Sequence, residues 1–264
     1  MKKLFYLSLA LLAWAACSTS KTQDNDPWGN IDPAEAGKRS SVVEFSMTSK
    51  VMGRRMYSQV WLPAQYDKTK TYPFLYLLHG YETSDQNGRF DKCWLEKGNA
   101  SRIADDYQKA NGVPMVIVMP NGLDKFYMSD GYEEYFEDEL MAAVEEEYKG
   151  NGKRAIAGLS MGGYGTVYHA LKYPSKFKYA YAMSPAVDAS MAGMVSGPDG
   201  LPGITIETGE QDMTTRLSSI RPFVNAMKNK GVEVEFIVRE GTHDWTFWQG
   251  CLPKALIQVG ESFK

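Results

Sequence analysis

The feature that most constrains the fold is an alternation of short apolar runs with helical patterns, which begins near residue 41. Six of the apolar runs are too short for helices: PFLYLLHG, PMVIVMP, KRAIAGLS, KYAYAMSP, GITIETGE and VEVEFIVRE. Helical periodicity marks segments between them, such as NASRIADDYQKAN and YFEDELMAAVEEEY. Continuous apolar strands are typical of a parallel sheet that is covered on both faces by helices. The sequence therefore predicts one α/β domain over residues 41–264.

Two more β-rich segments, SVVEFSMT and RMYSQVWLP, flank SKVMGR and predict a hairpin ahead of these runs. Together they predict a mostly parallel central sheet of about eight strands. The formal net charge is −3, and the chain has no block of Lys or Arg. A nucleic-acid-binding protein would show a basic patch, so we expect no nucleic-acid partner.

The first sixteen residues have the features of a signal peptide. Two lysines precede an apolar run at residues 4–16 that is too short to cross a bilayer, and small residues surround Cys17. Residues 17–40 are polar and rich in turn formers, which predicts a tether. The arrangement resembles a bacterial lipoprotein signal that is lipidated on Cys17; ordinary secretory cleavage is the alternative. We expect export to the periplasm, outer membrane or cell surface, with membrane contact only through this lipid anchor.

A glycine-rich segment follows the run KRAIAGLS, which brings Ser160 to the carboxyl edge of the predicted sheet, where ligands bind in such folds. Gly158 and Gly162 lie two residues before and two residues after this serine. A sharp strand-to-helix turn needs small residues at both places, so GLSMG matches the GxSxG nucleophile elbow. Glycines that only pack a helix on the sheet are the alternative. A dinucleotide-binding GxGxxG fits less well, because GYGTVY ends in Tyr168.

A serine nucleophile needs a base within reach, and the chain has three histidines. His169 lies nine residues along the same predicted helix, roughly 13 Å from Ser160, and cannot reach it. His79 ends the strand FLYLLHG, where this architecture forms its oxyanion loop, and we interpret it as an organiser of that loop. His243, in REGTHDWTFW after the last predicted strand, reaches the same edge as Ser160 and is the predicted base.

The base needs a carboxylate to orient it, and this group should follow an intervening strand. The segment GITIETGEQDMTTRL offers Glu207, Glu210 and Asp212. Glu207 lies within the strand, and Asp212 lies deeper in the loop than Glu210, so we favour Asp212; capping of the next helix is its alternative role. The resulting order of serine, aspartate and histidine along the chain is that of the α/β-hydrolases.

These motifs resemble the esterases related to esterase D, a family with S-formylglutathione hydrolase, feruloyl and acetylxylan esterases and mycolyltransferases. YLLHGY, VIVMPNG, AIAGLSMGGYG, ETGEQD and EGTHDWTFW stand in the family's order over about residues 41–262. The resemblance implies the α/β-hydrolase fold and a catalytic triad of Ser160, Asp212 and His243. It also implies an oxyanion hole made by the backbone N–H groups of Met161 and Tyr81, although HGYETSDQNG departs from the common glycine-rich loop.

Together with the signal peptide, the resemblance implies an exported serine carboxylesterase. Its HDWTFW ending and its signal peptide favour feruloyl or acetyl esters on plant-type polysaccharide as substrates. Acyl transfer, thioester hydrolysis and a non-catalytic polysaccharide-binding lipoprotein are the alternatives. We expect no metal or organic cofactor, because the chain has no HExxH motif and three scattered histidines do not make a multi-histidine site.

Aromatic residues gather in the segments expected at the active edge, where they could line a site for a flat acyl group or a sugar ring. The set comprises Trp94, Tyr127, Tyr132, Tyr135, Tyr164, Trp245 and Trp248. The favoured substrate-binding residues are Trp94, Tyr135, Tyr164 and Trp245, and packing in the core is the alternative for each. For Cys93 and Cys251 the sequence leaves two alternatives, a disulfide or two free thiols.

Overall fold

The computed structural model describes residues 39–82 and 88–264. The predicted signal peptide, Cys17 and nearly all of the predicted tether lie outside the described residues. Within the described part of the chain, no helix is both long enough and apolar enough to cross a membrane.

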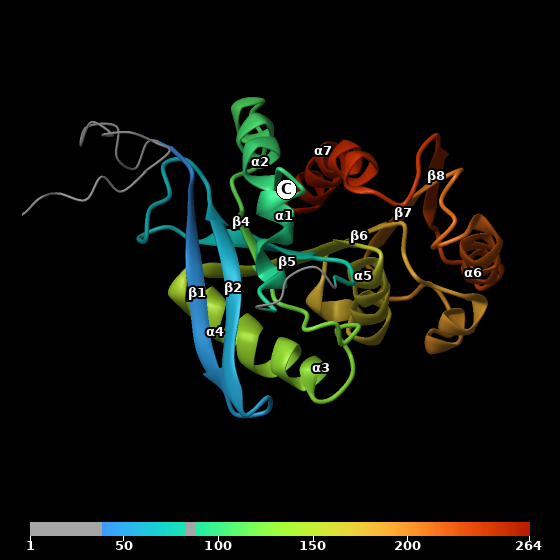
Figure 1. The fold of residues 1–264 in the computed structure, drawn as a ribbon, viewed down its shortest axis with the longest axis horizontal. Coiled ribbons are helices and arrows are strands. Elements are labelled where there is room, and N and C mark those ends of the chain that lie inside the picture. Colours follow the sequence, from blue (N-terminus) through green and yellow to red (C-terminus); the bar gives the residue numbers. More distant parts are fainter. Residues whose placement is uncertain (1–38, 83–87) are drawn as a thin grey trace, which may run out of the picture. The chain divides into compact units, whose positions relative to one another are not determined.

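Eight strands of the described residues form one sheet in the order β1-β2-β4-β3-β5-β6-β7-β8 (Figure 1). The first two strands form the predicted hairpin, β2 pairs with β4 in antiparallel fashion, and all other neighbours are parallel. The mostly parallel sheet is therefore confirmed. The strands are β1 (Ser41–Ser49), β2 (Arg54–Leu62), β3 (Tyr72–Leu78), β4 (Val116–Pro120), β5 (Gly150–Leu159), β6 (Tyr179–Met183), β7 (Gly203–Gly209) and β8 (Glu235–Arg239).

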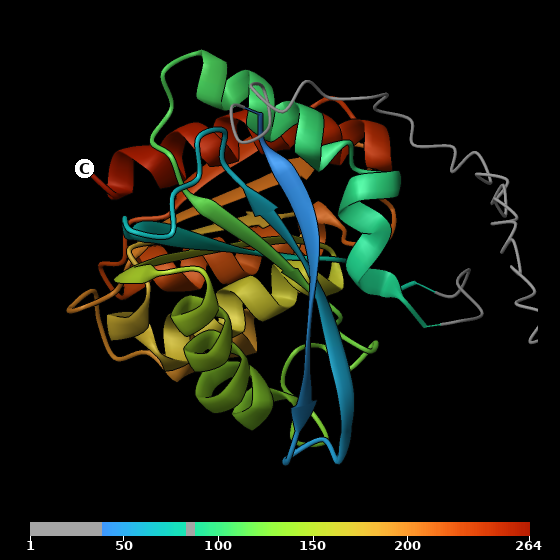
Figure 2. The same cartoon turned by 90° about the vertical axis from the view of Figure 1, so that its left-hand side faces the viewer.

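Helices cover both faces of the sheet (Figures 1 and 2). One face carries α1 (Cys93–Glu96), α2 (Ala100–Lys109) and α7 (Trp245–Ser262). The other carries α3 (Tyr132–Glu134), η2 (Tyr135–Leu140), α4 (Met141–Glu147), α5 (Met161–Lys172) and α6 (Leu217–Asn229). Three short 3-10 turns complete the described elements: η1 (Phe90–Lys92), η3 (Pro174–Lys176) and η4 (Ala189–Met194).

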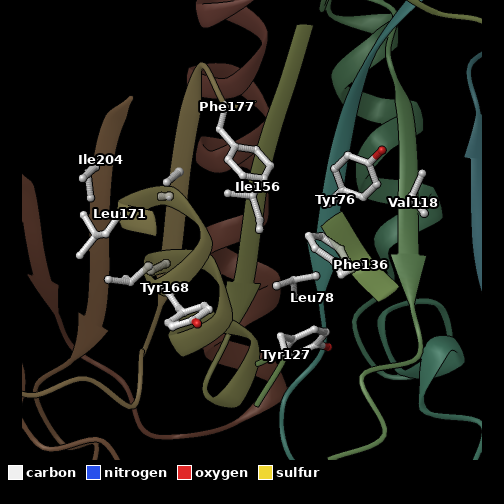
Figure 3. Packing of buried hydrophobic residues seen from close by; sticks show 14 of the residues in the cluster. Tyr76, Leu78, Val118, Tyr127, Phe136, Ile156, Tyr168, Leu171, Phe177 and Ile204 are labelled. Carbon is white, nitrogen blue, oxygen red and sulfur yellow. The ribbon is translucent and has the colours of Figure 1, made fainter. Parts of the chain in front are cut away.

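The continuous apolar strands are explained by this double cover. In β4, Val116 and Val118 point into the core beneath α4 and α5, whereas Ile117 and Met119 point into the core beneath α2 and α7. Figure 3 shows the first of these cores, where Val118 and Ile156 from two strands meet residues of the covering helices. Because both faces are buried, the strands are anchored, and the loops at their carboxyl ends start from fixed positions.

Candidate active site

Ser160 lies between the last residue of β5 and the first residue of α5, as the motif predicts. Its φ of 53° and ψ of −114° are strained for a residue with a side chain. The flanking glycines make the turn sterically feasible. A Cβ on Gly162 would lie 2.4 Å from the carbonyl oxygen of Leu78, and one on Gly158 would lie 2.5 Å from that of Gly162. The packing thus requires glycine at both places.

The structure brings the predicted serine, histidine and aspartate together in one hydrogen-bonded chain. The Oγ of Ser160 lies 2.9 Å from Nε2 of His243, and Nδ1 of His243 lies 2.7 Å from Oδ2 of Asp212. The other carboxylate oxygen of Asp212 accepts from the backbone N–H groups of Thr214 and Thr215, at 2.9 and 2.8 Å. Since Asp212 is an acceptor in each of these bonds, the imidazole donates from Nδ1 and is free to accept the serine proton at Nε2.

The ionised form of Asp212 is stabilised by its partners. Burial by itself would raise the pKa of this carboxyl group, but hydrogen bonds from His243 and Thr215 outweigh it and lower the pKa to about 2. The group is therefore a carboxylate at any ordinary pH. The two rejected candidates lie elsewhere: Glu207 is buried against Tyr181 and Arg239, and the side chain of Glu210 is exposed.

The loops that carry Asp212 and His243 are joined to each other, which the sequence did not predict. The backbone N–H of Gln211 donates to the carbonyl of Gly241 at 3.0 Å, and the Gln211 side chain accepts from the Gly241 N–H at 2.7 Å. Gly209 lies so close that a Cβ there would be 2.2 Å from the Gly241 oxygen. These contacts fix the separation of Asp212 and His243. One glutamine and two glycines, in segments so far apart in the chain, form no motif from which this contact could have been predicted.

His79, interpreted from the sequence as an organiser of the loop that follows β3, contacts the first residues after that strand. It is 1% exposed, and its Nε2 accepts from the backbone N–H of Gly122 at 2.7 Å. Its Nδ1 therefore carries the proton, which it donates to the carbonyl of Gly80 at 2.6 Å. That carbonyl belongs to the same planar peptide as the N–H of Tyr81, so His79 fixes the orientation of a predicted oxyanion donor. Gly80 lies against the elbow, because a Cβ on it would be 3.3 Å from the Cβ of Ser160.

The second predicted donor, the N–H of Met161, belongs to the first residue of α5. The first N–H groups of a helix have no acceptor within the helix, so this group can bind an external oxygen. The side chain of Met161 is buried and takes no part in the site.

A pocket of about 320 Å³ opens beside Ser160. Its lining consists of Gly80, Tyr81, Glu82, Leu159, Ser160, His243, Asp244, Trp245 and Trp248. Trp248 packs edge-on against the imidazole of His243 at a centroid distance of 4.9 Å. Trp245 packs in the same manner against Trp248, at 5.4 Å. Aromatic walls and a small number of polar groups are typical of a site for a small organic ligand.

The aromatic predictions are only partly right. Trp245 lines the pocket, and Tyr164 is half-buried outside the lining. The prediction for Trp94 and Tyr135 is wrong, because each is 1% exposed. The indole N–H of Trp94 donates to the carbonyl of Leu78, and the ring of Trp94 packs edge-on against Trp245. Tyr135 packs inward from η2 against the α5 face of the sheet.

Trp248 lines the pocket although it was not favoured, whereas Tyr127 and Tyr132 are in the core. Cys93 and Cys251 are both buried, and no disulfide joins them in the described part of the chain. The thiol of Cys251 instead lies 3.3 Å from the carbonyl of Phe247. Among residues 39–82 and 88–264, no three His, Cys, Asp or Glu side chains are grouped as metal ligands.

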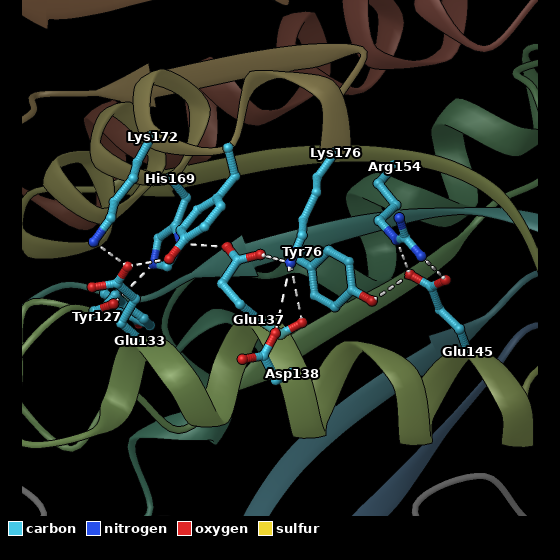
Figure 4. A network of polar contacts seen from close by, with 11 residues as sticks. Tyr76, Tyr127, Glu133, Glu137, Asp138, Glu145, Arg154, His169, Lys172 and Lys176 are labelled. Carbon is cyan, nitrogen blue, oxygen red and sulfur yellow. Dashed lines mark hydrogen bonds and ion pairs between the residues drawn. The ribbon is translucent and has the colours of Figure 1, made fainter. Parts of the chain in front are cut away.

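His169 is fully buried on the far side of α5, in the polar network of Figure 4. Its Nδ1 lies 2.6 Å from a carboxylate oxygen of Glu137, and its Nε2 donates to the backbone carbonyl of Tyr127 at 2.8 Å. Lys176 also lies 2.7 Å from Glu137. This network ties α5 to η2 and to the loop after β4. It therefore positions the helix that begins at the serine.

Comparisons with known proteins show which family this chain resembles. The family model described as "Putative esterase" matches residues 49–220, a range that includes Ser160 and Asp212. A protein of Xylanibacter ruminicola named endo-1,4-beta-xylanase/feruloyl esterase is 28% identical over 232 residues, which cover 81% of this chain and 30% of that protein. An acetyl esterase of Caldicellulosiruptor saccharolyticus is 26% identical over 228 residues, which cover 69% of this chain and 80% of that protein.

Among solved structures, a ferulic acid esterase superposes with a TM-score of 0.75 at 29% identity, covering 86% of this chain and 99% of that one. An S-formylglutathione hydrolase from Agrobacterium tumefaciens gives 0.71 at 20% identity, over 86% of this chain and 97% of that one, which shows the shared fold. The protein is thus an α/β-hydrolase. Within that class, the chain belongs to the esterase family. It spans less than a third of the length of the xylanase/feruloyl esterase.

Proposed function

We propose that this protein is an exported serine carboxylesterase that hydrolyses feruloyl or acetyl esters on plant-type polysaccharide. The observation that carries the proposal is the hydrogen-bonded chain of Ser160, His243 and Asp212 beside an aromatic pocket at the carboxyl edge of the sheet. The relatives named feruloyl esterase and acetyl esterase support the substrate class.

In the proposed mechanism, Nε2 of His243 takes the hydroxyl proton of Ser160 while Oγ attacks the ester carbonyl. The N–H groups of Met161 and Tyr81 stabilise the charge that develops on the carbonyl oxygen. Asp212 stabilises the imidazolium, which then gives its proton to the leaving alcohol. Water enters next and attacks the acyl carbon as it loses a proton to His243; the imidazolium then returns this proton to Oγ of Ser160, and the carboxylic acid is released.

The pocket favours a flat aromatic acyl group over acetyl. Its volume of about 320 Å³ lies at the lower end of the range for sites that enclose drug-sized ligands, which is more than an acetyl group requires. Trp245 and Trp248 supply ring surfaces that suit a planar hydroxycinnamoyl group. We therefore place feruloyl ahead of acetyl.

Export and membrane attachment are proposed from the sequence of residues 1–17, with lipidation on Cys17 ahead of ordinary secretory cleavage. Incorporation of a labelled fatty acid in a bacterial host, lost in Cys17→Ser, would support the lipid anchor. Secretion of an unlabelled mature chain would favour the alternative.

A substrate panel tests the enzymatic proposal. Catalytic efficiency is compared for methyl ferulate, acetylated xylan, an aryl acetate and a short acyl thioester, with Ser160→Ala as the inactive control. We expect methyl ferulate to rank first. Preference for the thioester would contradict the polysaccharide proposal, and inertness toward all four would favour a binding protein with this fold.

A further inference from the structure

A second pair of aromatic side chains lies near Ser160 but outside the pocket. Tyr164 stands one helical turn after the serine, and its backbone N–H donates to the carbonyl of Ser160 at 2.9 Å. The ring of Phe126, from the loop after β4, meets the ring of Tyr164 edge-on at a centroid distance of 5.5 Å. Phe126 is 39% exposed, whereas the next residue, Tyr127, is fully buried. We call Phe126 and Tyr164 the platform.

The backbone holds Phe126 outward in a conformation that large side chains rarely adopt. Its φ is +52°, a value that is an outlier for a bulky residue. Such strain persists only where the surroundings impose it, and it concentrates at ligand sites. At Phe126 the conformation is imposed through the next residue. The backbone carbonyl of Tyr127 accepts from the buried His169, and the phenol of Tyr127 donates to the carbonyl of His79.

Tyr164 of the platform and two residues of the pocket lining belong to opposite faces of the sheet. Leu159 and Trp248 of the pocket lining belong to the core beneath α7, whereas Tyr164 packs against the core beneath α5. An ester extends in two directions from its carbonyl carbon. If the acyl group occupies the pocket, the alcohol points away from it, and the platform is the aromatic surface on that side.

The chemistry around the two rings suits a sugar. The apolar surface is small and has charged neighbours, since Lys125 and Asp130 form an ion pair in the same loop. Asp188 lies close enough to Tyr164 to contribute, after burial and Tyr168, to the raised pKa of its phenol. An aromatic ring can pack against the C–H face of a sugar, and carboxylates accept hydrogen bonds from its hydroxyl groups. The two rings thus suit the C–H face of a sugar, and the carboxylates beside them suit its hydroxyl groups.

We propose that Phe126 and Tyr164 bind a sugar ring of the leaving alcohol and so confer a preference for esters on polysaccharide over simple alkyl esters. This inference rests on the proposed function, because the platform acts on an ester that Ser160 attacks. It assigns substrate binding to Tyr164, which the sequence had favoured, and to Phe126, which was not among the aromatic residues expected at the site.

The test compares kcat/KM for a feruloylated xylo-oligosaccharide with kcat/KM for methyl ferulate. The ratio of the two does not depend on the fraction of folded enzyme. We expect Phe126→Ala and Tyr164→Ala to lower this ratio about tenfold, mainly through KM for the oligosaccharide, while Phe126→Tyr retains it. Ile257→Ala, which removes another exposed apolar side chain from α7, is the matched control and should retain the ratio. A ratio within twofold of the wild-type ratio in both alanine variants would contradict the proposal that the platform binds a sugar.

The proposed function fails separately if the wild-type protein hydrolyses neither ester. In that case, calorimetric titration of unesterified xylo-oligosaccharide into the wild-type chain tests the platform alone. Binding that is lost in Phe126→Ala supports it. Absence of binding to the wild type, or equal binding to both proteins, rejects it.

Discussion

The imidazole of His243 is held from both sides, because its Nδ1–H donates to Asp212 and its Nε2 faces the hydroxyl of Ser160. Replacement of Asp212 by Asn should therefore lower kcat by roughly 1,000- to 10,000-fold, since the amide can favour the wrong tautomer of the imidazole. Steady-state hydrolysis of an aryl ester measures this loss of kcat.

Ser160→Ala should lower kcat at least as much as Asp212→Asn, because removal of one member disables the whole unit.

Glu210→Gln is the matched control for Asp212→Asn. Both changes replace a carboxylate by an amide in one loop, but the Glu210 side chain is exposed and does not contact the imidazole. Activity close to that of the wild type is expected. A greater loss in Glu210→Gln than in Asp212→Asn would mean that the acid has been misassigned.

His79 is a positioning residue that acts through the peptide joining Gly80 and Tyr81. His79→Gln removes the Nδ1 donor, and we expect kcat to fall about tenfold or more with little change in KM. His79→Asn can place an amide N–H near the Nδ1 position and should retain more of kcat. Affinity for a tetrahedral boronate inhibitor should fall in parallel with kcat. Equal kcat values in the two variants, with unchanged inhibitor affinity, would leave His79 with a packing role only.

The sequence predicted the arrangement of Ser160, Asp212 and His243 because residues at the carboxyl ends of neighbouring parallel strands must meet at one edge. It could not predict which aromatic side chains reach the substrate. Phe126 and Tyr127 are adjacent and chemically similar, yet one is exposed and the other is buried. Both have positive φ values without being glycine, and that backbone path carries no pattern in the sequence.

At the scale of elements, the relative positions of Asp212 and His243 depend on contact between the loops after β7 and β8. Gly209→Ala would place a Cβ about 2 Å from the carbonyl oxygen of Gly241, so the loops must move apart. Because a small misplacement of a catalytic group is costly, we expect kcat/KM to fall about 100-fold. Activity and the thermal midpoint, Tm, are measured together. Gly193→Ala in η4, where an added Cβ meets nothing within 4 Å, should change neither.

The sequence predicted the strands of the sheet but not the order in which they lie side by side. The six apolar runs identified strands β3 to β8, and two β-rich segments identified the hairpin β1–β2. They did not reveal that β4 lies between β2 and β3, because buried strands of similar composition can exchange neighbours without exposing apolar surface. Similarly, the predicted helix YFEDELMAAVEEEY contains a π-helical segment, Tyr135–Leu140, from which Glu137 faces His169.

At the scale of the whole molecule, buried His79 links stability to pH. Burial lowers the pKa of His79 from its ordinary value of 6.5 to about 4, only partly offset by the hydrogen bond with Gly80. Below pH 6.5 the unfolded chain therefore takes up a proton that the folded chain does not. The free energy of unfolding therefore decreases as pH falls from about 6.5 toward 4. The decrease due to His79 is about 3 kcal/mol.

The contribution of Asp212 to stability changes in a separate and more acidic pH range. Its lowered pKa of about 2 means that its contribution is present above pH 3.8 and disappears only as pH falls from there toward 2. Denaturant unfolding at pH 7, 5.5 and 4.5 therefore isolates His79 from the aspartate. We expect the wild type to lose free energy of unfolding across this range, and His79→Gln to start lower at pH 7 but lose less. If both proteins lose the same amount between pH 7 and 4.5, protonation of His79 does not limit the acid stability of the fold.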